Sequence, residues 1–105
     1  MLHESLFVSD RVHERTVKLP DGAEHALHFK ELPASEFRRF HLAETANDEE
    51  KKIASMAMLI ASSLCEPDGK PAITVKKAMQ LTASAANAIV EAVLEVNGFG
   101  KAGKE

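Results

Sequence analysis

The first half of the chain contains two runs in which polar and apolar residues alternate, separated by a turn sequence. The runs are residues 12–19 and 24–31, and the sequence Pro20-Asp-Gly-Ala23 stands between them. Two runs of period two around a Pro-Asp-Gly turn are typical of a β-hairpin. The pattern therefore predicts two antiparallel strands near the N-terminus.

The register of this hairpin decides which side chains share a face of the sheet. A two-residue loop at 21–22 pairs Val17 with Ala26 and leaves Phe29 on the opposite face. A shift of one residue, through a three-residue loop or a bulge, gathers the large apolar side chains on one face: Val17, Leu19, Leu27 and Phe29. Burial favours this second register. Because a lone hairpin is marginal in water, we expect that face to cover helices or a partner.

Four helices are predicted after the hairpin, and each has a start signal. The signals are, in chain order, Pro33-Ala34-Ser35, a capping box from Asn47 to Glu50, Thr74, and then either Thr82 or Ser84. The fourth helix is expected to end at Asn97-Gly98, with Gly98 in the left-handed position that favours glycine.

Helical spacing also predicts the faces that form the core. The second helix carries the clearest apolar stripe of the chain, made of Ile53, Met56, Ala57, Ile60 and Leu64. The fourth helix has a wide apolar face, made of Ala86, Ile89, Val90, Val93, Leu94 and Val96. The first helix adds Phe37 and Phe40, and the short third helix contains Val75, Ala78 and Met79.

These elements predict one small domain of the α+β class that is mainly α. In it, an N-terminal β-hairpin is followed by about four helices packed as a small bundle. No linker rich in Pro, Gly or Ser separates the polar first half from the apolar second half. We therefore expect a single domain at residues 1–98 and a flexible C-terminal tail at residues 99–105.

Composition narrows the classes of protein that fit this fold. The 105 residues are 45% hydrophobic, but only 5% are aromatic, and Trp and Tyr are absent. With 13 Lys and Arg against 16 Asp and Glu, the formal net charge of -3 argues against binding to duplex nucleic acid. The single cysteine excludes a disulfide framework and favours a reducing, cytoplasmic setting. No segment has the pattern of a signal peptide or a membrane span, so we expect no membrane contact.

Three features suggest chemistry, and we expect none of them to form an active site. Residues 98–104 approach the phosphate-loop pattern, but a helix precedes them and Glu105 stands where that loop needs Ser or Thr. His25 and His28 are three residues apart, so on a strand they face opposite sides and cannot hold one ion together. Cys65 is interpreted as a small buried hydrophobe. We therefore expect no catalytic residue, no metal site and no cofactor.

Four residues are candidates for contact with a protein partner. Arg38 and Arg39 lie on the outer face of the first predicted helix, where they suit an acidic partner and equally suit a solvated surface. Met58 falls off the core stripe, and flexible thioethers such as those of Met58 and Met79 suit adaptable binding. Gap filling in an Ala-rich core is the alternative for both methionines. The candidate set for partner binding is thus Arg38, Arg39, Met58 and Met79.

Three blocks of the sequence resemble a known family. They are Phe29-Lys-Glu-Leu-Pro-Ala-Ser-Glu-Phe37-Arg-Arg, Leu59-Ile-Ala-Ser-Ser-Leu-Cys65-Glu-Pro-Asp-Gly69-Lys-Pro71 and Ala92-Val-Leu-Glu-Val-Asn-Gly98. In this order they resemble the tail assembly chaperones of long-tailed, siphophage-type bacteriophages and prophages, over residues 8–98. The middle block is the most diagnostic, because it joins a helix ending in Leu-Cys to an acidic Asp-Gly turn. None of the blocks is a catalytic signature.

The resemblance implies a non-enzymatic phage tail assembly chaperone. Such a protein binds the tape measure protein, keeps its long hydrophobic helices soluble and promotes tail tube assembly, with the major tail protein as a further partner. It is expected in the host bacterial cytoplasm and not in the mature virion. Many members are also made in a longer, frameshifted form, with which the Gly-Lys pairs at 100–101 and 103–104 are compatible.

The partner is expected on the helical Ala, Met and Val surface or along a hairpin edge. Small residues in the fourth helix would also allow a homo-oligomer. Two other classes of function remain open. One is a small oligomeric adaptor or structural subunit of a phage tail, which would stay in the virion. The other is an enzyme or nucleotide binder that uses Cys65, the histidines or the terminal Gly-Lys segment.

Overall fold

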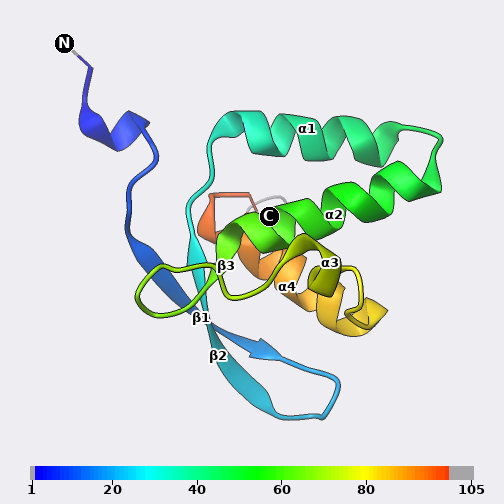
Figure 1. The fold of residues 1–105 in the computed structure, drawn as a ribbon. Coiled ribbons are helices and arrows are strands. Elements are labelled where there is room, and N and C mark those ends of the chain that lie inside the picture. The colour runs from blue at the N-terminus through cyan, green and yellow to red at the C-terminus, as the bar shows by residue number, and fades with distance from the viewer. Residues whose placement is uncertain (1, 100–105) are drawn as a thin grey trace.

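The computed structural model describes residues 2–99, in which an antiparallel sheet packs against helices (Figure 1). In chain order the elements are a short 3₁₀ helix η1 (Glu4–Leu6), β1 (Val12–Lys18), β2 (Glu24–Lys30), α1 (Ala34–Thr45), α2 (Glu49–Ser63), β3 (Leu64–Cys65), α3 (Val75–Ala78) and α4 (Ala83–Val96). The strands lie in the order β1-β2-β3. The predicted α+β, mainly α fold, with a hairpin followed by four helices, is thus confirmed.

The hairpin has the register in which its large apolar side chains share one face. Val17 pairs with His25, and the Leu19 N–H donates to the Ala23 carbonyl at 3.1 Å, which leaves residues 20–22 as a three-residue loop. Gly22 in this loop has a φ of +84°, a left-handed conformation that glycine adopts without strain. On the shared face, Val17 and Phe29 are buried, and Leu19 and Leu27 pack partly buried against the core. This confirms the register that burial favours.

The shared face of the hairpin closes one side of a core between the sheet, α2 and α4. Phe29 in β2 is fully buried, and so are Ile60 in α2 and Val93 in α4. All three side chains belong to one apolar cluster. At the edge of this core, Arg15 Nε lies 3.2 Å from Glu95 Oε1 and links β1 to α4. The hairpin thus covers helices, as expected because an isolated hairpin is only marginally stable in water.

The structure adds a third strand that the sequence did not predict. α2 ends at Ser63, and Leu64 and Cys65 form β3, which pairs antiparallel with β2. The interpretation that placed Leu64 on a helix is therefore wrong, although Leu64 is buried as expected. The Ser63 hydroxyl donates to the Lys30 carbonyl of β2 at 2.8 Å. This bond draws the chain alongside β2, where strand pairing replaces a further turn of helix.

The apolar stripe of α2 is buried over only part of its length. Ala57 and Ile60 are buried as predicted, but Ile53 is 44% exposed, so its assignment to the core is wrong. Leu59 and Ser63 are buried in addition. The reason is position along the helix, because the end of α2 that carries Ile53 follows the connection to α1 and projects beyond the sheet (Figure 1). Periodicity identified the face of α2 but not the length over which other elements cover it.

The helix caps agree with the sequence except at α2. Asp48, not Asn47, is the N-cap, and Asp48 Oδ1 accepts from the backbone N–H of Glu50 at 3.0 Å. The predicted capping box from Asn47 to Glu50 is therefore wrong by one residue. A carboxylate has the advantage there because its charge also suits the positive end of the helix. The other two side-chain caps are confirmed, since Thr74 Oγ1 accepts from the Lys77 N–H and Thr82 Oγ1 from the Ala85 N–H.

Asn97 joins the end of α4 to the connection between β2 and α1. Its Oδ1 accepts from the Leu32 N–H and its Nδ2 donates to the Val93 carbonyl, both at 2.8 Å. Gly98 follows with a φ of +89°, which confirms the predicted left-handed helix end. One amide side chain therefore satisfies backbone groups of α4 and of a connection that lies 65 residues earlier in the chain.

Replacing Asn97 by alanine is expected to lower the free energy of unfolding by about 1–2 kcal/mol, because the part-buried Leu32 N–H loses its acceptor. Urea denaturation followed by circular dichroism measures the change. Asn87, which is exposed on the same helix, provides the matched control, and Asn87→Ala should shift the midpoint little. Equal effects of the two substitutions would show that the Asn97 bonds contribute nothing specific.

Phe99 is the last residue that the structure describes. Its N–H donates to the Leu94 carbonyl at 2.8 Å, and its ring lies against Phe37 with the centroids 4.9 Å apart. Residues 100–105, which include both Gly-Lys pairs, lie outside the described residues. The division into a domain at 1–98 and a flexible tail at 99–105 stays a prediction.

The chain before β1 forms an N-terminal arm, which we define as residues 2–8. The hydrogen bonds of the arm within residues 2–99 are local, such as that from the Phe7 N–H to the Glu4 carbonyl. Its attachment to the rest of the fold comes at Ser9, whose N–H donates to Glu31 Oε1 at 3.0 Å. Figure 1 shows the arm projecting from the sheet and away from the helices.

Replacing Glu31 by glutamine is expected to reduce the loss of folding stability that occurs as the pH falls into the acidic range. The Ser9 N–H, and then the His13 side chain 2.9 Å away, hydrogen-bond the carboxylate and hold the pKa of Glu31 below its ordinary value of 4.5. A lowered native pKa stabilises the fold above pH 4.5, and this stabilisation is lost as the pH falls through the native pKa. Urea midpoints measured from about pH 7 down to about pH 3 should therefore fall less steeply for Glu31→Gln.

The matched control for this titration is Glu44→Gln, because Glu44 is exposed on α1 and has no ion pair within residues 2–99. That variant should follow the wild-type curve. If Glu31→Gln also follows it, the hydrogen bonds to Glu31 do not stabilise the fold.

Candidate partner-binding groove

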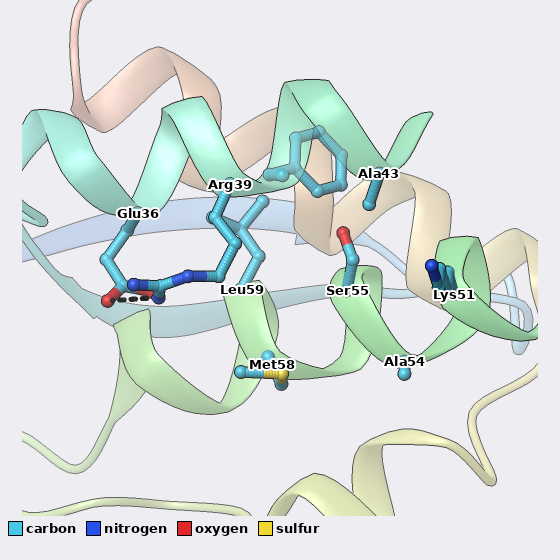
Figure 2. Close-up of a pocket in the computed structure, with 9 residues that line it drawn as sticks. Glu36, Arg39, Ala43, Lys51, Ala54, Ser55, Met58 and Leu59 are labelled. Atoms are coloured by element: carbon cyan, nitrogen blue, oxygen red, sulfur yellow. Dashed lines mark hydrogen bonds and ion pairs between the residues drawn. The ribbon is translucent and has the colours of Figure 1, made fainter. Parts of the chain in front are cut away.

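α1 and α2 form a helical hairpin with a groove between them (Figure 2). The groove has a volume of about 220 Å³. Its lining comes from both helices: Glu36, Arg39, Phe40 and Ala43 of α1, and Lys51, Ala54, Ser55, Met58 and Leu59 of α2. Pockets for small molecules are usually larger, about 300–1,000 Å³. The groove is therefore better suited to one or a few apolar side chains of another protein segment.

Short side chains account for the space. Ala43 on α1 and Ala54 on α2 both line the groove, and their methyl groups leave room that longer side chains would fill. Phe40, Met58 and Leu59 supply the larger apolar surfaces. The two walls of the groove therefore belong to the two helices of one hairpin.

A serine hydroxyl lies inside this apolar lining. Ser55 Oγ is buried and has no hydrogen-bond partner among residues 2–99. Figure 2 shows Ser55 pointing from α2 toward α1, into the space between the helices. Buried polar atoms nearly always have a partner. A bound segment that places a donor or acceptor there would satisfy this hydroxyl.

The rim of the groove carries more positive than negative charge. Arg39 Nη1 lies 3.0 Å from Glu36 Oε2, so these two charges largely compensate each other. Lys51 is exposed on the α2 side and forms no ion pair within residues 2–99. The groove thus combines an apolar floor with a net basic rim, on a chain whose formal net charge is -3.

The structure brings together two of the four candidate partner-binding residues. Arg39 and Met58 both line the groove, from α1 and α2 respectively. Arg38 is exposed on α1 but does not line it, and Met79 is 51% exposed at the end of α3. The exposure of both methionines removes gap filling as their role. Partner binding by any of the four stays a prediction.

Sequence reasoning missed the other groove residues. Ala43, Ala54 and Ser55 are small side chains that line the α1–α2 interface. The available signal was the helical spacing of Ala54 and Ser55, which lie on the side of α2 away from the core stripe.

Among the groups considered for catalysis, Cys65 of β3 lies opposite His28 of β2, and no hydrogen bond joins their side chains within residues 2–99. Cys65 is buried, and this burial raises the pKa of its thiol above the ordinary value of 9.0. A raised pKa favours the neutral thiol over the nucleophilic thiolate. His25 Nε2 instead lies 3.0 Å from Asp21 Oδ2 in the hairpin loop region. Within residues 2–99, no group of three His, Cys, Asp or Glu side chains could hold a metal ion.

In the same part of the chain, no helix combines the length and apolar character needed to cross a membrane. The phosphate-loop-like segment lies largely in residues 100–105, outside the described residues.

Comparison with known proteins gives a likeness in fold and none in sequence. The sequence matches no protein-family model and no curated protein. The fold is similar to the solved structure of the bacteriophage HK97 tail assembly chaperone, with a TM-score of 0.54 and 14% sequence identity. The match covers 86% of this chain and 86% of the HK97 chain. The chain therefore has the fold of a phage tail assembly chaperone, as the sequence resemblance implied.

Proposed function

We propose that this protein is a non-enzymatic tail assembly chaperone of a long-tailed phage or prophage. In this role it binds the tape measure protein, keeps that protein soluble and promotes assembly of the tail tube. The observation that carries the proposal is the fold shared with the HK97 tail assembly chaperone over 86% of both chains. The three sequence blocks in residues 29–98 give separate support, because their resemblance to the family lies in the sequence and not in the fold.

The α1–α2 groove is the proposed docking site for the tape measure protein. A long hydrophobic helix presents rows of apolar side chains, and the groove offers an apolar floor of matching size. Strong hot spots usually contain Trp, Tyr or Arg, and this chain has neither Trp nor Tyr. The affinity for the tape measure protein is therefore proposed to be modest and the binding reversible. Reversible binding suits a protein that leaves the tail before assembly is complete.

The remaining parts of the proposal follow from the same role. The protein acts in the host bacterial cytoplasm, has the major tail protein as a further partner, and is absent from the mature virion. Mass spectrometry of purified virions addresses the last point. Presence in the virion at the abundance of tail proteins would favour the alternative, a structural subunit or small adaptor of the tail.

Co-expression with the tape measure protein of the same gene cluster tests the proposal directly. We expect the tape measure protein to become soluble and to be retained with an affinity-tagged copy of this chain. If no complex forms and the solubility of the tape measure protein does not rise, the proposed function is wrong.

Met58→Glu is expected to weaken this complex by about tenfold, because a charge must then be buried against the apolar floor of the groove. Met79→Glu is the matched control, since Met79 is an exposed methionine outside the groove. Retention measured at several salt concentrations compares the two variants. A loss confined to Met79→Glu would move the docking site from the groove to the surface around α3.

A further inference from the structure

The hydroxyl of Ser55 is unusual among the groups that line the α1–α2 groove. Ser55 Oγ is buried, yet it has no hydrogen-bond partner within residues 2–99. By contrast Ser63, which is also on α2, donates to the Lys30 carbonyl at 2.8 Å. An unpaired buried hydroxyl lowers stability, and alanine would fill the same position of the helix without that cost. The hydroxyl therefore points to a contact that forms when the groove is occupied.

Ser55 lies between the apolar part of the groove and its basic end. Phe40, Met58 and Leu59 supply the large apolar surfaces. Lys51 comes one helical turn before Ser55, so the two side chains are neighbours on one side of α2. Figure 2 shows Ser55 pointing toward α1, with Met58 and Lys51 on opposite sides of it. An occupant that fills the apolar part therefore brings a neighbouring side chain to the hydroxyl and the ammonium group.

Lys51 gives this end of the groove a positive charge. The other two charged residues of the lining largely compensate each other, because Arg39 Nη1 lies 3.0 Å from Glu36 Oε2. The acidic residues Glu49 and Glu50, which precede Lys51 on α2, do not line the groove. A carboxylate suits this place best, because it accepts a hydrogen bond from the hydroxyl while its charge pairs with the ammonium group.

We propose that the α1–α2 groove selects helical segments in which an acidic residue lies one turn from a large apolar residue. The apolar side chain packs beside Met58, and the carboxylate accepts from the Ser55 hydroxyl and pairs with Lys51. This inference rests on the proposed function for the identity of the partner. It adds the class of tape measure segment that docks in the groove and the residues that recognise it.

The buried hydroxyl makes the groove selective among hydrophobic helices. Apolar contacts alone discriminate weakly between such helices, because one pocket accepts many apolar side chains of similar size. A purely apolar segment would cover Ser55 Oγ without giving it a partner, and that unpaired group penalises the complex. Ser55 is therefore a specificity-determining residue, which disfavours the wrong segment as well as binding the right one.

Selection from a displayed library of helical peptides tests the proposal without the tape measure protein. Each peptide keeps one large apolar residue, and the positions one turn away on the same face are varied. The full-length chain should enrich Asp and Glu at one of these positions. Ser55→Ala should accept aliphatic residues there, and Lys51→Gln should accept Asn and Gln as readily as Asp and Glu. A wild-type selection that yields no peptide, or only apolar ones, overturns the proposal.

The affinity of one enriched peptide gives the size of the effect. Replacing its acidic residue by leucine should raise the dissociation constant for wild type by about tenfold or more. The same replacement should change it little for the double variant Ser55→Ala/Lys51→Gln. Ser62→Ala and Lys52→Gln are the matched controls, since both residues lie on α2 outside the groove, and they should keep the wild-type preference. An unchanged preference in the double variant would show that the two side chains do not recognise the partner.

Urea denaturation of Ser55→Ala separates this role from a structural one. Because the hydroxyl has no partner within the described fold, its removal should leave the urea midpoint unchanged or raise it. A lower midpoint would show that the fold already satisfies the hydroxyl, and would overturn the proposal.

The pull-down with the tape measure protein measures a different property from the peptide selection. If the pull-down fails while the selection succeeds, the proposed function is wrong and the acidic helix belongs to another protein. If the pull-down succeeds while wild type shows no preference for acidic peptides, the proposed function stands and this inference is wrong.

Discussion

Replacing Phe29 by alanine is expected to lower the free energy of unfolding by about 3–5 kcal/mol. Phe29 is 0% exposed and lies in the central strand of the sheet, where it faces the core between α2 and α4. Removing the ring takes away its apolar burial and leaves a cavity that the two flanking strands cannot close. Since domains of this size are stable by only about 5–15 kcal/mol, the variant should be close to unfolding.

The measurement is urea denaturation followed by circular dichroism, because the chain has no Trp or Tyr for fluorescence. Phe7→Ala is the matched control, since Phe7 is exposed in the arm, and it should change the unfolding free energy by at most about 0.5 kcal/mol. Both variants are compared at the same low protein concentration. If the two losses lie within about 1 kcal/mol of each other, Phe29 is not the centre of this core.

Local signals in the sequence were sufficient for the hairpin and most of the helix caps. The register followed because only one alignment buries Val17 and Phe29 together. The strand β3 could not be found in this way. It has two residues, too few for a pattern of period two, and its pairing partner in β2 lies more than thirty residues earlier in the chain.

The residues of the candidate groove could be predicted only in part, because the groove also depends on contacts between segments that are separate in the sequence. Exposure and residue type selected Arg38, Arg39 and Met58, but neighbouring arginines on a helix point about 100° apart. The packing of α1 against α2 decides which of the two arginines lines a groove. The sequence of one helix by itself does not determine that packing. The structure selects Arg39 and sets it beside Met58. Small residues on the α1–α2 interface, such as Ala43 and Ala54, were the sequence signal for the space between them.

The apolar stripe of α2 shows the same limit most clearly. Ile53 and Ile60 are seven residues apart, so they lie on one face of the helix and no periodicity can separate them. What separates them is the extent of the elements that pack on that face. Ile60 belongs to the buried cluster that residues of the sheet and α4 also form, whereas Ile53 is 44% exposed and is not among the residues packed on that cluster.

This difference gives the second large effect that we expect. Ile60→Ala should lower the free energy of unfolding by about 2–5 kcal/mol, because Ile60 is fully buried in the core cluster and its loss leaves a cavity. Ile53→Ala makes the same chemical change on the same helix face, but Ile53 is largely exposed. Alanine also has the higher helix propensity, so that variant should be within about 0.5 kcal/mol of wild type. The urea midpoints of the two variants are measured side by side. Because both variants replace isoleucine by alanine on the same face of α2, a difference between their midpoints reports the difference in burial. Equal losses would mean that a further surface covers Ile53 in solution, because an exposed isoleucine side chain has little buried surface to lose.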